Sequence, residues 1–174
     1  MDVNAIVELF RRTLTEHYFD TKGRVGRPEF WWFMGACVVI SIIASILDSI
    51  TGLRILNVLA GLALLLPTAG MGIRRLQDTG RNGTLVWVEV GLYAIVLVMG
   101  LFLAFTAFST PYGAVVYFGA FAALSSLLML ISLGALVIAV ALVYFWIQPG
   151  NTEANQYGPP PPVFSPNPTA PKAG

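Results

Sequence analysis

The chain has 174 residues, of which 56% are hydrophobic and 11% are charged, and its mean hydropathy is +0.75. A soluble domain must cover itself with polar side chains, and this chain has too few of them, so the composition excludes a soluble fold. The net charge of +1 is uninformative about partners. The basic residues lie beside apolar stretches and form no solvated patch, which disfavours nucleic acid as a partner. Cys37 is the single cysteine of the sequence, so no disulfide framework is expected.

An amphipathic pattern comes first along the chain. In residues 1–20 apolar side chains recur three or four positions apart, which predicts an amphipathic helix. We expect an interfacial helix on the cytoplasmic leaflet, and a helix packed on the protein's own cytoplasmic loops carries about equal weight. The run Arg27-Pro28-Glu29 then predicts the start of a longer helix. Proline suits the first helical position, and an acidic side chain suits the positive end of the helix dipole.

Four long apolar stretches follow this start. A transmembrane helix needs about 20 apolar residues to cross about 30 Å of hydrocarbon, and each stretch meets that length or nearly so. The predicted fold is therefore an all-α membrane protein with an N-terminal interfacial amphipathic helix and four transmembrane helices. Their expected positions are about 30–50, 55–73, 85–108 and 123–147.

Three parts are expected on this basis. Residues 1–29 form a cytoplasmic amphipathic helix and a Gly-Arg motif, and residues 30–148 form the transmembrane domain. Residues 149–174 form a cytoplasmic Pro-rich tail, which is mostly disordered from residue 159 onward. Residues 112–122 leave three alternatives open: an extension of the fourth helix, a short outer helix, or a segment that re-enters the bilayer.

The distribution of basic residues predicts the orientation. Nine of the ten Lys and Arg residues lie before the first stretch, between the second and third, or after the fourth. The first connection holds only Arg54, and the third holds no charged residue. This positive-inside pattern predicts a multi-pass membrane protein with both termini in the cytoplasm. Asp48 and Arg54 bracket the first outer turn, and we expect them to pair there.

Three polar motifs fall on the predicted cytoplasmic face. Residues 22–33 read Lys-Gly-Arg-Val-Gly-Arg-Pro-Glu-Phe-Trp-Trp-Phe, residues 72–83 read Gly-Ile-Arg-Arg-Leu-Gln-Asp-Thr-Gly-Arg-Asn-Gly, and residues 149–158 read Pro-Gly-Asn-Thr-Glu-Ala-Asn-Gln-Tyr-Gly. In this order and around these spans, the motifs resemble the bacterial membrane family known as domain of unknown function 805, over roughly residues 18–159. The resemblance implies the bacterial inner (plasma) membrane and supplies no reaction.

The chain departs from the pattern of this family at three places. Gln77 stands where the family commonly has His, Thr84-Leu85 replaces a Trp pair, and Thr21 replaces an aromatic residue. Without a His at position 77 the obvious general base is missing, so no catalytic residue is predicted. His17 and Cys37 are isolated in the sequence, so neither a metal site nor a cofactor is predicted. The sequence favours a non-enzymatic protein.

Asp78 is the residue that simple helix capping leaves unexplained. Arg74 and Arg75 complement the negative end of the second span, and Gly80 suits a left-handed cap. A carboxylate at this end is unfavourable by a few tenths to about 1 kcal/mol, so Asp78 needs a basic partner. The candidate partners are Arg74, Arg81, Arg24 and Arg27.

We therefore predict a polar cluster on the cytoplasmic face. Its candidates for binding an anionic lipid head group or another phosphate are Arg24, Arg27, Arg74, Arg75 and Arg81. Its structural members are Glu29, Asp78, Glu89, Asn155 and Tyr157. Two main roles stay open for the cluster: neutralising charge so that the helices are fastened together, and binding phosphate. Catalysis is a third and less favoured role.

The leading function is a non-enzymatic inner-membrane protein that contacts membrane lipids or a protein partner. The alternative is a small transporter or channel subunit, for which Glu89, about one turn into the third span, is the candidate proton-coupling acid. A lipid head-group-modifying enzyme is the third class. Small residues in the last span permit close helix approach, and homo-oligomerisation and packing within the chain explain them equally well.

Overall fold

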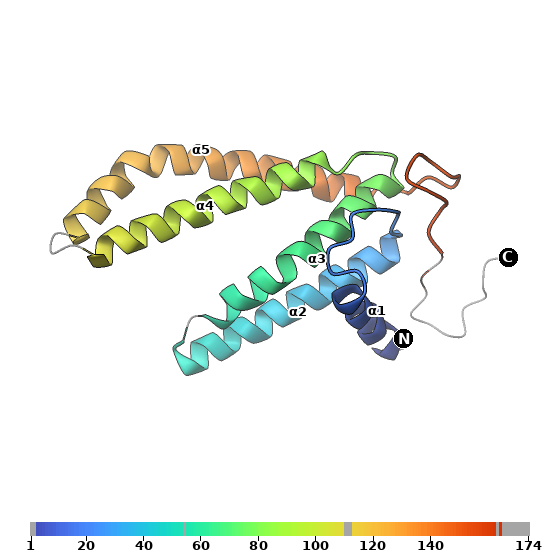
Figure 1. The fold of residues 1–174 in the computed structure, drawn as a ribbon, viewed down its shortest axis with the longest axis horizontal. Helices are drawn as coiled ribbons and strands as arrows, with labels where there is room; N and C mark the ends of the chain where they lie inside the picture. The colour runs from blue at the N-terminus through green and yellow to red at the C-terminus, as the bar shows by residue number, and fades with distance from the viewer. Residues whose placement is uncertain (1–2, 54, 110–112, 163, 165–174) are drawn as a thin grey trace. The chain divides into compact units, whose positions relative to one another are not determined.

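The computed structural model describes residues 3–53, 55–109, 113–162 and 164, and from 103 to 126 it describes only the side chains of Phe105, Ser109 and Ala122. These residues form five α-helices and no strand. The helices are α1 (Val3–Thr15), α2 (Arg27–Thr51), α3 (Leu56–Asp78), α4 (Thr84–Ser109) and α5 (Gly113–Ile147) (Figure 1). The prediction of an all-helical protein is confirmed over the described residues.

Four of these helices are long and apolar enough to cross a membrane. The candidate spans are Arg27–Thr51, Leu56–Asp78, Thr84–Phe102 and Leu127–Ile147. The prediction of four such segments is confirmed. Residues 113–122 belong to α5, so of the three alternatives for this region the structure has an extension of the last helix.

The chain divides into two compact units. The first unit comprises Met1–Gly83 and Phe145–Gly174, and the second comprises Thr84–Tyr144. In the first unit, α2 and α3 lie side by side and α1 packs against α2 (Figure 1). Their shared core is made of buried apolar side chains: Leu9, Val25, Phe30, Phe33, Cys37, Leu64 and Met71.

The ends of α2 follow from its sequence. Gly26 precedes the helix in an extended conformation, and Pro28 lies in the first turn, where its missing N–H costs nothing. At the other end Gly52 has φ 72°, and its N–H donates to the carbonyl of Asp48. The helix therefore begins close to the predicted start and ends at a left-handed glycine.

The side chain of Asp48 also caps the start of the next helix, α3. Its carboxylate accepts the backbone N–H groups of Ile55 at 3.0 Å, Leu56 at 2.9 Å and Asn57 at 2.9 Å. These are the N–H groups at the start of α3, which have no partner inside that helix. Asp48 thus caps α3 from the end of α2, while its expected partner Arg54 lies outside the described residues.

The last turn of α3 ends in a Schellman motif. The N–H of Arg81 donates to the carbonyl of Leu76 at 3.0 Å, and the N–H of Gly80 donates to that of Gln77 at 3.0 Å. Gly80 has φ 78°, the left-handed conformation that this motif requires. The predicted left-handed cap at Gly80 is confirmed.

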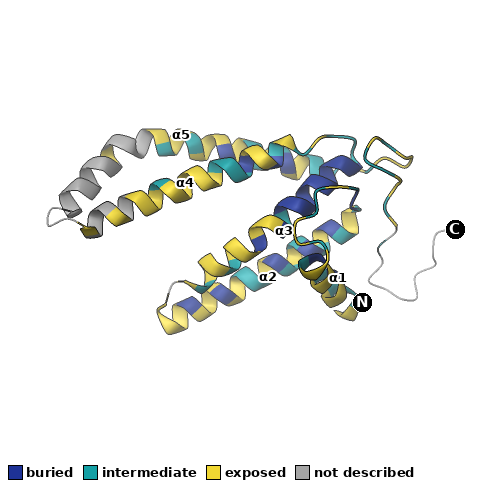
Figure 2. Ribbon diagram, in the orientation of Figure 1, coloured by how far each residue is buried: buried dark blue, intermediate teal, exposed yellow. Residues whose placement is uncertain are grey.

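The C-terminal end of α3 is enclosed on every side. Each residue from Ala69 to Asp78 is buried, and Figure 2 shows this end of the helix in dark blue. A Cβ added at Gly70 would lie 2.8 Å from the carbonyl oxygen of Asp20, and one added at Gly72 would lie 2.9 Å from the Trp146 ring. The loop before α2 and the end of α5 therefore press directly on the α3 backbone.

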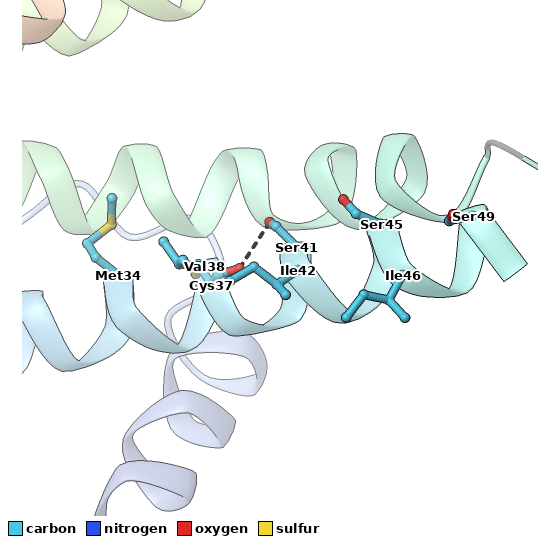
Figure 3. Close-up of a pocket in the computed structure, with 8 residues that line it drawn as sticks. All are labelled: Met34, Cys37, Val38, Ser41, Ile42, Ser45, Ile46 and Ser49. Carbon is cyan, nitrogen blue, oxygen red and sulfur yellow. Dashed lines mark hydrogen bonds between the residues drawn. The ribbon is translucent and has the colours of Figure 1, made fainter.

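The C-terminal half of α2 carries a line of serines. Ser41, Ser45 and Ser49 lie along one side of the helix (Figure 3). Ser41 Oγ donates to the carbonyl of Cys37 at 3.0 Å, and Ser45 Oγ accepts from Asn57 Nδ2 at 2.7 Å. The hydroxyls of Ser41 and Ser45 are therefore satisfied within the α2–α3 pair.

Candidate functional site

An ion-paired cluster lies at the enclosed end of α3 and consists of Arg24, Arg75 and Asp78. Arg24 Nε donates to Asp78 Oδ1 at 3.0 Å, and Arg75 Nη1 donates to Asp78 Oδ2. The side chains of Arg24, Arg75 and Asp78 are 1%, 0% and 4% exposed. The Asp78 carboxylate is thus held between two guanidinium groups, and we call these three residues the Arg–Asp cluster.

The guanidinium of Arg24 is surrounded by protein oxygens. Besides Nε, its Nη1 donates to the carbonyls of Glu153 at 2.8 Å and Gly158 at 3.2 Å, and its Nη2 donates to that of Asn151. Nη2 also lies 2.9 Å from Asp78 Oδ1. These contacts match the five N–H hydrogens that a guanidinium carries. Arg24 therefore ties the loop before α2 to both α3 and the segment after α5.

Arg75 ties α3 to the end of α5. Its Nε donates to the carbonyl of Trp146 at 3.1 Å, and its Nη2 donates to that of Gln148. The Trp146 indole in turn donates to the carbonyl of Gly72 at 3.1 Å. The last carbonyls of a helix lack partners within it and carry partial negative charge, so a buried guanidinium is a favourable cap for α5.

Two more predicted arginines contact the end of α5. Arg27 Nη1 donates to the carbonyl of Ile147 at 3.4 Å, and the guanidinium carbon of Arg81 lies 4.4 Å from the centre of the Phe145 ring. The second contact is a cation–π interaction. Arg27 is exposed and Arg81 is half-buried, in contrast to the Arg–Asp cluster.

Gln77 joins the first and third motifs. Its side-chain Nε2 donates to the backbone carbonyl of Thr21 at 3.0 Å, and its backbone carbonyl accepts from Asn155 Nδ2 at 2.9 Å. Asn155 Oδ1 accepts the backbone N–H of Tyr157 at 2.9 Å. Two positions that depart from the family pattern, Thr21 and Gln77, are therefore in contact. Asn155 contributes its amide to this junction, and Tyr157 contributes its backbone.

Gly150 is a site residue that the sequence did not single out. A Cβ added there would overlap Asp78 Oδ2, so only glycine fits this approach. The neighbouring Asn151 N–H donates to the Asp78 carbonyl at 2.8 Å. The Pro-Gly start of the third motif was visible in the sequence, but nothing in that pattern says which side chain the glycine must admit.

Arg74 lies apart from the Arg–Asp cluster and faces the loop before α2. Its Nη1 is 3.8 Å from Asp20 Oδ2, and its Nη2 lies 3.1 Å from the sulfur of Met71. Asp20 also contacts His17 Nδ1 at 3.0 Å, and Glu29 interacts electrostatically with Arg74. Of the arginines proposed for Asp78, the structure therefore brings Arg24 to it and directs Arg74 to Asp20.

The charge of Asp20 is stabilised by its neighbours. Partial burial by itself would raise the pKa of Asp20, but the backbone N–H of Lys22, the charge of Arg74 and the hydrogen bond from His17 outweigh it. The pKa of Asp20 therefore lies below its ordinary value.

Glu89 lies in the second unit, on α4. Its side chain is buried, as are both carboxylate oxygens. Tyr93, one turn further along α4, interacts with the Glu89 carboxylate electrostatically and through a side-chain hydrogen bond. Glu89 and the Arg–Asp cluster thus belong to different units, and the membership of Glu89 in the cytoplasmic-face cluster stays a prediction.

Chemically, the Arg–Asp cluster is suited to holding three chain segments together. Its buried donors point at backbone carbonyls and at one carboxylate, as the contacts above show. Among the described residues, no three His, Cys, Asp or Glu side chains gather where a metal ion would bind.

Comparison with known proteins gives the family. The model of the family described as "Protein of unknown function (DUF805)" matches residues 18–159. The chain belongs to this family. All three motifs that meet at the end of α3 lie within the matched DUF805 region. Together with the four apolar helices, membership of the family identifies the chain as a membrane protein.

Two curated relatives come from Escherichia coli strain K12. The chain is 35% identical to the uncharacterized protein YiiR over 94 residues, which cover 51% of this chain and 60% of YiiR. It is 34% identical to the inner membrane protein YhaI over 73 residues, which cover 41% of this chain and 62% of YhaI. The chain thus spans less than two thirds of the length of either relative. No solved structure matches the chain.

Proposed function

We propose that this chain is a multi-pass protein of the bacterial inner membrane with four transmembrane helices and both termini in the cytoplasm. The positive-inside distribution of nine of its ten basic residues supports this orientation. The similarity to an inner membrane protein of E. coli supports the compartment. In this orientation the end of α3 and the Arg–Asp cluster lie at the cytoplasmic leaflet, and α1 lies along that leaflet as an interfacial helix.

The proposed role of the Arg–Asp cluster is to fasten the cytoplasmic segments to one another. The observation that carries this role is the saturation of Arg24, whose guanidinium makes five nitrogen–oxygen contacts to protein atoms. A guanidinium that binds phosphate must direct several N–H groups at the ligand. Arg24 and Arg75 direct theirs at the chain itself, so their function is structural.

Contact with anionic lipid head groups then falls to the more accessible arginines, Arg27 and Arg81. Arg27 is exposed, and its contact with the Ile147 carbonyl is long, at 3.4 Å. Basic residues at the cytoplasmic leaflet attract anionic lipid by about 1 kcal/mol each. The protein is therefore a non-enzymatic membrane component whose fastened cytoplasmic face rests on anionic lipid or receives a protein partner.

Cysteine labelling tests the orientation. In a Cys37→Ala background, Glu153→Cys and Thr51→Cys each place one thiol at an exposed position. A membrane-impermeant maleimide added to spheroplasts should label Thr51→Cys only, and inverted vesicles should reverse the result. Labelling of Glu153→Cys from outside the cell would overturn the proposed topology.

A pair of substitutions tests the division of roles among the arginines. Arg75→Ala should abolish the folded protein in detergent, whereas Arg27→Ala should keep its melting temperature and weaken binding to phosphatidylglycerol vesicles. An Arg75→Ala protein that melts normally and loses only lipid binding would show that the cluster is a ligand site.

A small transporter is the second candidate function, and it rests on Glu89. A buried acid in a membrane helix is a functional site by default. Reconstituted vesicles that lose a proton-driven flux on Glu89→Gln, with unchanged protein content and melting temperature, would move this candidate to first place.

A further inference from the structure

An apolar groove separates α1 from α2 in the first unit. Its α1 wall consists of Ile6, Val7 and Phe10, and its α2 wall includes Gly35, Ala36 and Val39. The volume of the groove is about 450 Å³, within the range of sites that hold organic ligands. Its lining carries no charged side chain, hydroxyl or amide group.

The groove is open because the contact between α1 and α2 uses other side chains. Leu9 and Thr13 are the buried residues of α1, and Phe10 stacks on Phe33 with ring centres 5.4 Å apart. Val7 stays 59% exposed. On the α2 side, a Cβ added at Gly35 would meet no atom within 4 Å. A glycine followed by an alanine thus leaves a hollow that no side chain of the described residues fills.

The depth of the groove indicates its occupant. Its α2 wall runs from Trp32 to Ile40, which is about 12 Å along a helix that rises about 1.5 Å per residue. One leaflet contributes about half of a hydrocarbon core that is about 30 Å thick. Trp32 and its exposed neighbour Trp31 mark the interfacial end, because tryptophan is enriched at that level. The groove therefore spans most of one leaflet, starting from its head-group side.

An acyl chain fits this description better than a protein segment does. The groove is open along α2, where Val39 is 55% exposed and Ile43, one turn further on the same side, is 51% exposed. A helix of a second copy, about 10 Å wide with its side chains, is too wide to enter between two helices that already contact each other. A single hydrocarbon chain requires no polar partner, and inside the bilayer it is held by van der Waals packing against the groove walls, because lipid tails and apolar side chains are equally apolar.

We propose that α1 and α2 hold one acyl chain of a membrane phospholipid between them. The lipid occupies the cytoplasmic leaflet, and its chain lies between Val7 and Phe10 on one side and Gly35 and Val39 on the other. Because the lipid touches both helices, it fixes α1 against the membrane. This inference rests on the orientation proposed above.

Photo-crosslinking tests the groove. The probe is phosphatidylglycerol with a diazirine halfway along one acyl chain, added at a few molecules per protein in dodecyl maltoside micelles. Cross-links located by mass spectrometry should concentrate at Val7, Phe10 and Val39. Gly35→Leu fills the hollow and should reduce them about tenfold. Even labelling of α2, with Val38 and Ile42 reacting as much as Val39, would overturn the proposal.

Gly61→Leu is the matched control. Gly61 is also an exposed helical glycine where an added Cβ meets nothing within 4 Å, and it lies on α3 away from the groove. It should leave the cross-links unchanged. Val7→Trp fills the groove from the α1 side and replaces Gly35→Leu if that variant fails to melt cooperatively. If the topology labelling holds and both filling variants keep their cross-links, the groove proposal alone is refuted.

Discussion

The guanidinium of Arg24 lies 3.0 Å from the carboxylate of Asp78, although 54 residues separate them in the chain. Both side chains are almost completely buried, and Arg75, one turn before Asp78 on α3, places a second guanidinium on the same carboxylate. Removing one partner from such a group leaves an uncompensated buried charge, which is more damaging than removing the whole group. The first prediction follows from this asymmetry.

Asp78→Ala should lower the free energy of unfolding by about 3–5 kcal/mol, because two buried arginines lose their common carboxylate. Thermal unfolding followed by circular dichroism in detergent measures the change. Glu8→Ala is the control, since it removes a pair with Arg11 in which both side chains are 58% exposed, and it should have no measurable effect. Equal melting of the two variants would show that the Arg–Asp cluster does not stabilise the fold.

Gly150→Ala should be as damaging as loss of the carboxylate itself. The added methyl group would occupy the place of Asp78 Oδ2, so the segment after α5 must move away and release Asn151 and Gln148 from their contacts. Gly61→Ala adds the same methyl group where nothing lies within 4 Å. A melting temperature of Gly150→Ala at or above that of Gly61→Ala would contradict this contact.

Asp48→Ala should lower the melting temperature by several degrees, since three N–H groups at the start of α3 lose their acceptor. Asp48→Asn should be intermediate, because the amide keeps one oxygen acceptor. Ser49→Ala, at the neighbouring exposed position, serves as the control and should melt like the parent protein. If Asp48 instead acted mainly through its charge, the Asn and Ala variants would melt alike.

Glu89→Gln should leave the melting temperature unchanged or raise it. The side chain of Glu89 is buried, so the neutral amide removes a desolvated acid, and its oxygen can still accept the hydrogen bond of Tyr93. Asp48 differs from Glu89, because both acids lie in candidate spans and the Asp48 carboxylate accepts three backbone N–H groups at the start of α3. A fall of many degrees on Glu89→Gln would reveal a partner that holds the carboxylate.

The contribution of Asp20 should depend on pH. The folded state lowers the pKa of Asp20 below its ordinary value of 3.8, so the unfolded chain binds more protons between the two values and stability rises with pH across that window. The stabilisation by the Asp20 carboxylate is therefore complete above its ordinary pKa and is lost as the pH falls through the folded pKa.

Asp20→Asn is the variant that tests this dependence, since its amide oxygen still accepts the Lys22 N–H while the charge opposite Arg74 is gone. Its melting temperature should lie below that of the parent at about pH 6, and the difference should shrink as the pH falls below the ordinary pKa of Asp20. If the difference in melting temperature between Asp20→Asn and the parent stayed constant across this pH range, the loss of stability would come from side-chain shape and not from the charge of Asp20.

The helices themselves could be predicted from the sequence, because hydrocarbon imposes a length and a composition that soluble proteins lack. The positions of Pro28 and Gly80 marked a helix start and a helix end, since one has a fixed φ and the other adopts a positive φ without strain. The need of Asp78 for a basic partner was also predictable, from the sign of the helix dipole.

The remaining contacts of the site could not be predicted, because they are made to backbone atoms. Every residue carries a carbonyl, so no residue type announces that Gln148, Asn151 and Glu153 accept from arginine. The capping of α3 by Asp48 is hidden in the same way, since its acceptors are N–H groups seven to nine residues further on. A search for the partner of Asp48 by charge alone finds another charged residue such as Arg54 and does not consider backbone N–H groups.

The enclosure of the end of α3 also sets the order in which the protein matures. The arginines and Asp78 leave the ribosome long before residues 146–158, whose carbonyls and glycine complete their surroundings. A nascent chain that has inserted only its first spans therefore holds these side chains half-coordinated and open to water. Residues 146–158 close that surface when they arrive, so an enclosed end of α3 reports that the chain has been synthesised at least as far as Gly158.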